Sequence, residues 1–224
     1  DDFQRALMIT STAGWDTDCN SGNVGCLLGI KNGLPGLDGG PDWRGPVADR
    51  LYVVSADGGR AVTDALTETY HLANLGRALA GEPPLAPKNG ARFHFAQPGS
   101  VQGFRSHDPA ALLAIENAGE RGLALRYHAL ARPRVARAST PTFVPPEALP
   151  MPGYALAAAP TLYPGQTVRA EVAADASNPG PITVGLYLRY YGAGDALVHV
   201  TGPSAELVPG AQHSLAWPLD DTAA

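Results

Sequence analysis

The spacing of hydrophobic positions changes near residue 81. Before it, apolar and small residues recur at intervals of three and four, the period of a helix with one buried face. A first helix is expected to end before Gly14, and a second to follow that loop. A third is predicted from about Gly59 to Ala80, with Asp57 as its N-cap. The buried stripe of this third helix comprises Val62, Leu66, Thr69, Ala73, Gly76 and Leu79.

After residue 91 the pattern becomes one of short alternating runs, which is typical of strands. Pro-Gly pairs at Pro164-Gly165 and Pro209-Gly210 separate some of these runs. The predicted strands lie at 92–95, 103–105, 123–128, 167–172, 182–191, 197–200 and 213–217. Short strands separated by turns indicate a β-sandwich.

The chain is therefore predicted to be multidomain, with an α part followed by a β part. Residues 1–81 form an all-α helical portion, and the Pro-rich stretch 82–91 is a stiff linker. Residues 92–224 form an antiparallel β-sandwich accessory domain, expected to be incomplete. In architecture this second part resembles the jelly-roll sandwiches that accompany glycoside-active enzymes.

The loop Gly14-Trp15-Asp16-Thr17-Asp18 carries the clearest candidate chemistry. Two carboxylates one residue apart, in a loop that opens a helix, offer the oxygen ligands that Mg²⁺ and Ca²⁺ require. A simpler interpretation is that Asp16 and Asp18 only cap the helix. An EF-hand is excluded, because a loop that starts at Asp16 has Ser21 at the glycine position and Leu27 at the position of the bidentate glutamate.

This loop resembles the C-terminal motif of the ADP-ribosylglycohydrolase family, in which Gly-x-Asp-Thr-Asp-Thr/Ser runs into a small-residue-rich helix. A bacterial branch has the same Gly-Trp-Asp-Thr-Asp-Cys-Asn spelling. The resemblance implies that Asp16 and Asp18 bind magnesium beside an ADP-ribosyl group. The family's hydroxyl ligand is replaced by Cys19, a soft donor that suits magnesium poorly. The resemblance to the family motif continues beyond the loop. It covers the small residues of the following helix and the segment after it: Gly22, Gly25, Gly29, Gly33, Pro35 and Pro41-Asp42-Trp43.

The family's N-terminal motifs, a Gly-Asp-rich loop and a Thr/Ser-Asp-Asp run, have no counterpart before Asp16. By resemblance they supply further metal ligands and much of the pocket. The chain is accordingly expected to be an internal fragment that is inactive alone.

Composition limits the classes of partner. The net charge of −5 argues against binding nucleic acid through bulk electrostatics. No apolar run reaches the roughly 18 residues of a membrane helix. Cys19 and Cys26 lie seven residues apart on one predicted helix, about 10.5 Å along its axis, too far for a disulfide. A cytoplasmic location is expected.

Two functional hypotheses follow. The first is a magnesium-dependent hydrolase that cleaves a glycosidic bond at ADP-ribose, with an ADP-ribosylated or related nucleoside or sugar substrate. The alternative is a non-catalytic protein whose β-sandwich binds a glycan or another protein. The aromatic residues that either stack on sugar rings or fill the core are Tyr187, Tyr190, Tyr191 and Trp217.

Overall fold

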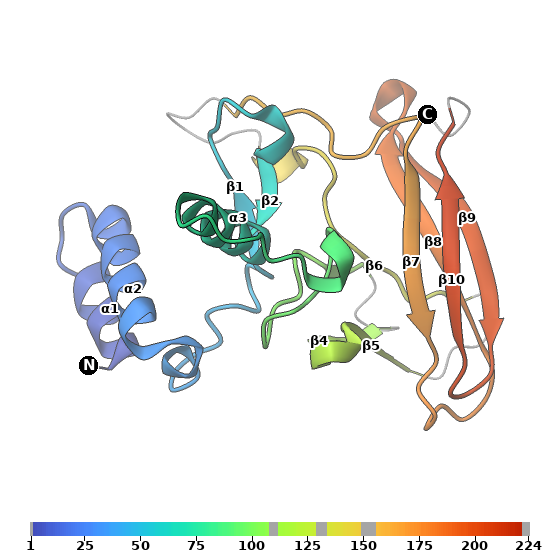
Figure 1. Ribbon diagram of the computed structural model, residues 1–224, viewed down its shortest axis with the longest axis horizontal. Coiled ribbons are helices and arrows are strands. Elements are labelled where there is room, and N and C mark those ends of the chain that lie inside the picture. The colour runs from blue at the N-terminus through green and yellow to red at the C-terminus, as the bar shows by residue number, and fades with distance from the viewer. Residues whose placement is uncertain (1, 108–111, 129–133, 149–155, 221–224) are drawn as a thin grey trace. The chain divides into compact units, whose positions relative to one another are not determined.

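The computed structural model describes residues 2–107, 112–128, 134–148 and 156–220. It divides into two compact units, Asp1–Ala159 and Pro160–Ala224 (Figure 1). The α-helices of the described residues are α1 (Phe3–Ser11), α2 (Thr17–Asn32) and α3 (Ala65–Leu79). The strands are β1 (Arg50–Tyr52), β2 (Val62–Asp64), β3 (Arg105–Ser106), β4 (Leu112–Asn117), β5 (Leu123–Tyr127), β6 (Ala138–Ser139), β7 (Thr167–Ala173), β8 (Ile182–Tyr191), β9 (Leu197–Leu207) and β10 (Gln212–Pro218).

The predicted fold class, an all-α portion followed by a jelly-roll-like β-sandwich, is wrong. Throughout the described residues the strands pair in twos, as the antiparallel sheets β1-β2, β3-β6, β4-β5, β7-β10 and β8-β9. One of these pairs, β1-β2, lies within the portion expected to be all-α. The later strands form separate ribbons, so the larger sheets of a sandwich are not built.

The start of α3 shows why the helical prediction was too long. Val62 and Thr63 are β-branched and favour extended backbone, and they pair with Tyr52 and Leu51 in β1. The helix begins only after Asp64, whose carboxylate accepts from the Thr67 amide at 2.9 Å and caps it. The predicted cap, Asp57, instead accepts from the Gly59 amide in a short 3₁₀ turn, Gly58–Arg60.

Helices α1 and α2 form a hairpin (Figure 1). Gly25 of α2 faces Leu7 of α1, and a Cβ at Gly25 would lie 3.7 Å from the Leu7 side chain, an ordinary van der Waals distance. The hydroxyls of Ser11 and Ser21 form a hydrogen bond of 2.8 Å between the helices. Neither helix has a fully buried residue.

The interior of the first unit is unusually polar. Gln102 is completely buried, and its side-chain oxygen accepts from the amides of His94 and Phe95, both at 2.8 Å. Its side-chain nitrogen donates to the Arg92 carbonyl at 3.1 Å and to the buried Asp64 carboxylate at 3.3 Å. Gln102 therefore joins the irregular segment 92–104 to the N-terminus of α3.

A second buried carboxylate, Asp49, completes this polar interior. It accepts from the Ser100 hydroxyl and the Val101 amide, both at 2.8 Å. Arg44 pairs with it at 3.3 Å and also donates to the Pro98 carbonyl. Asp49 and Arg44 thus hold residues 98–101, which belong to the irregular segment 92–104 that Gln102 also contacts. The strand predicted at 92–95 is absent because the amides of His94 and Phe95 bond to the Gln102 side chain instead of a neighbouring strand.

The second unit consists of the ribbons β7-β10 and β8-β9 (Figure 1). The predicted strand at 182–191 is confirmed, and the strand at 197–200 extends to Leu207. The two ribbons are in contact where the Trp217 side chain of β10 packs on Gly202 of β9. A Cβ added at Gly202 would lie 2.3 Å from the indole ring, so only glycine fits there. Trp217 therefore packs between the ribbons, which is the core-filling role of the two considered.

Each helix of the described residues is too short or too polar to cross a bilayer.

Replacing Gln102 with leucine tests the polar interior. The variant removes the acceptor from two buried amides, and each unsatisfied buried group costs about 1–3 kcal/mol. Gln102→Leu should lower the free energy of unfolding by about 3 kcal/mol, measured by urea denaturation with tryptophan fluorescence. Gln212→Leu, at an exposed position of β10, is the matched control and should change stability little. Equal effects of the two substitutions would contradict this role for Gln102.

Buried His94 should make stability depend on pH. Burial, together with Lys88, lowers the pKa of His94 below its usual value, against the opposing effect of Asp64. Its Nδ1 also accepts from the Ala96 amide at 3.2 Å. Below about pH 6.5 the unfolded chain protonates this histidine before the folded chain does. Stability should therefore fall as pH drops from about 6.5 toward the lower folded-state pKa.

Denaturation at several pH values checks this, with His94→Gln as the comparison. The substitution should remove the component of pH dependence that His94 contributes. An unchanged dependence in the variant would assign the effect to other groups.

Candidate metal site

The loop between α1 and α2 has a backbone conformation that fits its sequence. Gly14 has φ +87°, in the left-handed region where glycine is not strained. Asp16 is also left-handed, with φ 46° and ψ 45°, a conformation that aspartate tolerates better than most residues. The Asp16 carbonyl accepts from the Asn20 amide at 3.1 Å. This loop therefore places Asp16 at the N-cap of α2, directly before its first turn.

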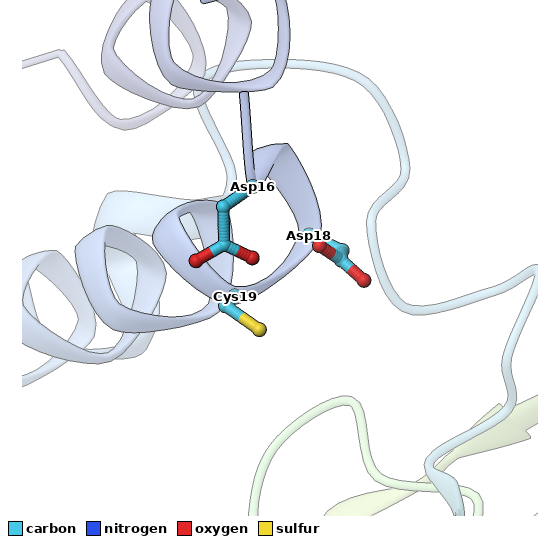
Figure 2. Close-up of side chains that lie close together, drawn as sticks. All are labelled: Asp16, Asp18 and Cys19. Atoms are coloured by element: carbon cyan, nitrogen blue, oxygen red, sulfur yellow. The ribbon is translucent and has the colours of Figure 1, made fainter. Parts of the chain in front are cut away.

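The structure brings the two predicted ligands together. One ligand atom from each of Asp16, Asp18 and Cys19 lies within 4.8 Å of the others, and all three side chains are exposed. Figure 2 shows them around the first turn of α2, with the Cys19 thiol beside the Asp16 carboxylate. Among the described residues no other three His, Cys, Asp or Glu side chains are grouped in this way.

Asp16 occupies the N-cap position but its side chain makes no capping hydrogen bond. This distinguishes it from Asp2 and Asp64, whose carboxylates accept from amides in the first turns of α1 and α3. Asp18 lies in the first turn, where a negative charge interacts favourably with the helix dipole. The capping interpretation therefore does not account for the Asp16 carboxylate.

The two aspartates disfavour ionisation of the Cys19 thiol. A hydrogen bond to the Asp16 carboxylate raises the pKa of Cys19, and the negative charges of Asp16 and Asp18 raise it further. A thiol that keeps its proton is a poor metal ligand and a poor nucleophile. The neighbouring aspartates therefore disfavour a role of Cys19 as a nucleophile.

The donor set fits a hard cation bound through Asp16 and Asp18. Two oxygens on one Mg²⁺ ion, each at about 2.0–2.1 Å, lie at most about 4.2 Å apart. The exposed carboxylates lie within 4.8 Å, so a small side-chain rotation brings them to that distance. Cys19 does not suit Mg²⁺, and water is the natural occupant of the remaining positions because this ion usually retains several waters.

Trp15, directly before Asp16, was not singled out as a site residue from the sequence. Its side chain is 85% exposed, although tryptophan is usually largely buried. The sequence signal was the residue itself, a large aromatic side chain directly before Asp16. Its ring is open to solvent.

A hollow lies at the opposite end of this hairpin from the Asp16 loop. It has a volume of about 360 Å³ and is lined by residues near the start of α1 and after α2, including Phe3, Asn32 and Trp43. Phe3 and Trp43 pack edge to face at 6.0 Å between ring centroids. The hollow is therefore separate from the Asp16 loop.

No protein-family model, curated protein or solved structure matches this chain.

Thiol reactivity tests the contact between Asp16 and Cys19. Removing the acceptor charge in Asp16→Asn should lower the pKa of Cys19 and speed its alkylation by iodoacetamide near pH 8, because the thiolate is the reactive form. Peptide mass spectrometry gives the rate at each cysteine. Exposed Cys26 serves as the internal reference, with an unchanged rate. A Cys19 rate that is insensitive to Asp16→Asn would contradict the contact.

Proposed function

We propose that this chain carries a magnesium-binding part of a hydrolase of the ADP-ribosylglycohydrolase type, which cleaves a glycosidic bond at ADP-ribose. The observation that carries the proposal is the Asp16 carboxylate, which makes no helix-capping bond and lies beside Asp18 in an exposed loop. The Gly14-Trp15-Asp16-Thr17-Asp18 spelling supports it, since it resembles the metal-binding motif of that family.

Asp16 and Asp18 are assigned to binding the ion, and no proton transfer is assigned to either. When bound, the ion supplies Lewis-acid chemistry that orients ribose hydroxyls and water and offsets developing negative charge. The hydrogen bond to Asp16 raises the pKa of Cys19, which disfavours a further negative charge at the site. All three side chains are exposed, so a cation held by Asp16 and Asp18 would be accessible to a substrate hydroxyl and to water.

Thermal unfolding in the presence of MgCl₂ tests ion binding. Magnesium that binds only the folded chain stabilises it by about 1.4 kcal/mol at a concentration tenfold above Kd, which raises Tm by a few degrees. Asp16→Asn and Asp18→Asn should each remove most of this shift. Asp38→Asn, at an exposed aspartate outside the loop, is the matched control and should retain it.

Magnesium that stabilises wild type and Asp16→Asn equally would contradict the assignment of the site. The reaction is tested separately by release of ADP-ribose from an ADP-ribosylated protein by the intact protein. Metal-assisted catalysis contributes several kcal/mol, so Asp16→Asn should slow release by about 100-fold or more. Release that is independent of magnesium and of Asp16 would overturn the proposed function.

A further inference from the structure

The connector between α3 and the segment 92–104 contains an exposed turn with an unusual backbone. Lys88 has φ 48° and ψ 46°, and Asn89 has φ 57° and ψ 34°. This left-handed region is unfavourable for lysine, although asparagine tolerates it better. Gly90 follows with φ 79°, where glycine is not strained. One hydrogen bond of the turn, from the Ala91 amide to the Lys88 carbonyl, is 3.3 Å long, slightly beyond the usual range. Such a turn opens more readily than a helix.

The side chain of Asn89 is not held in place. It is exposed, and within the described ranges its carboxamide forms no hydrogen bond. Two other asparagines show the contrast. The Asn74 side chain bonds to both the amide and the carbonyl of Leu85, and the Asn117 side chain donates to three backbone carbonyls. The Asn89 carboxamide is therefore able to rotate toward the backbone nitrogen of Gly90 when the turn opens.

We propose that Asn89 is a site of spontaneous deamidation, which converts it to aspartate and isoaspartate. The backbone nitrogen of Gly90 attacks the side-chain carbonyl carbon of Asn89 and gives its proton to solvent. The carboxamide nitrogen takes a proton and leaves as ammonia, so that a cyclic succinimide remains. Water then opens this ring at either carbonyl. Glycine favours the attack because it has no side chain to hinder the approach.

A second Asn-Gly pair, Asn32-Gly33, lies in a different setting. Asn32 is the last residue of α2, and the Gly33 amide donates to the Gly29 carbonyl at 2.9 Å. The nitrogen that would attack is thus bonded into the last turn of the helix. Deamidation there requires this turn to open first. The structure therefore predicts that Asn89 is modified before Asn32.

Modification of Asn89 changes the connector in two ways. Either product adds one negative charge to a chain whose formal net charge is −5. Isoaspartate also routes the main chain through its side chain, which lengthens the backbone by one methylene group. This change lies shortly before Arg92, whose carbonyl accepts from the buried Gln102 side chain at 3.1 Å. The inference depends on neither the metal site nor the proposed function.

Incubation of the whole chain at mildly alkaline pH, followed by peptide mass spectrometry, tests the proposal. Asn89 should deamidate roughly tenfold faster than Asn32, because an exposed turn opens more readily than a helix. The products should include isoaspartate, detected with an isoaspartate-specific methyltransferase. Asn89→Gln should remove the early product, since glutamine would have to form a larger ring. Asn32→Gln is the matched control and should leave that product unchanged.

The same incubation in urea separates the effect of the fold from that of the local sequence. The helix is lost in urea, so the rates at Asn89 and Asn32 should converge. A rate at Asn32 that equals or exceeds the rate at Asn89 in the folded chain would overturn the proposal. An early product that survives Asn89→Gln, or a difference between the two sites that persists unchanged in urea, would do the same.

Discussion

The buried side chain of Gln102 is the contact on which most of the first unit depends. It joins the segment 92–104 to Asp64, and Asp64 in turn caps α3. Several non-glycine residues around this contact have left-handed backbone, among them Ala48, Asp49, Phe95 and Gln102 itself. Such conformations cost of order 1 kcal/mol each, and the dense hydrogen bonding compensates for them. The unit is organised by satisfied polar groups more than by a large apolar core.

The periodicity of the sequence located many elements but not how they assemble. Strand β8 was predicted over its observed range because alternating residues mark it clearly. The start of α3 was misplaced because Val62 and Leu66 fit a helical stripe equally well, while the pairing of Val62 with Tyr52 becomes visible only in three dimensions. The prediction of a β-sandwich was wrong for a related reason. Alternation of apolar and polar residues predicts strands, but it carries no information about which strands pair.

The candidate site was easier to find than the polar interior. Asp16 and Asp18 are separated by a single residue in the sequence, so a local motif was enough to indicate them. Asp49, Asp64 and Gln102 are distant from one another and resemble ordinary surface residues until the chain folds. The sequence also left two interpretations of the metal pair open. The absence of a capping bond from Asp16 favours a cation over a cap.

A crystal structure of the chain with manganese, recorded at an anomalous wavelength, tests the central claim most directly. Manganese shares the preference of magnesium for oxygen ligands and gives a signal that identifies the ion. We predict a single strong peak between the Asp16 and Asp18 carboxylates, with the Cys19 sulfur outside coordination distance. An Asp16 carboxylate that caps α2 with no ion beside it would contradict the account, as would an ion bound through Cys19.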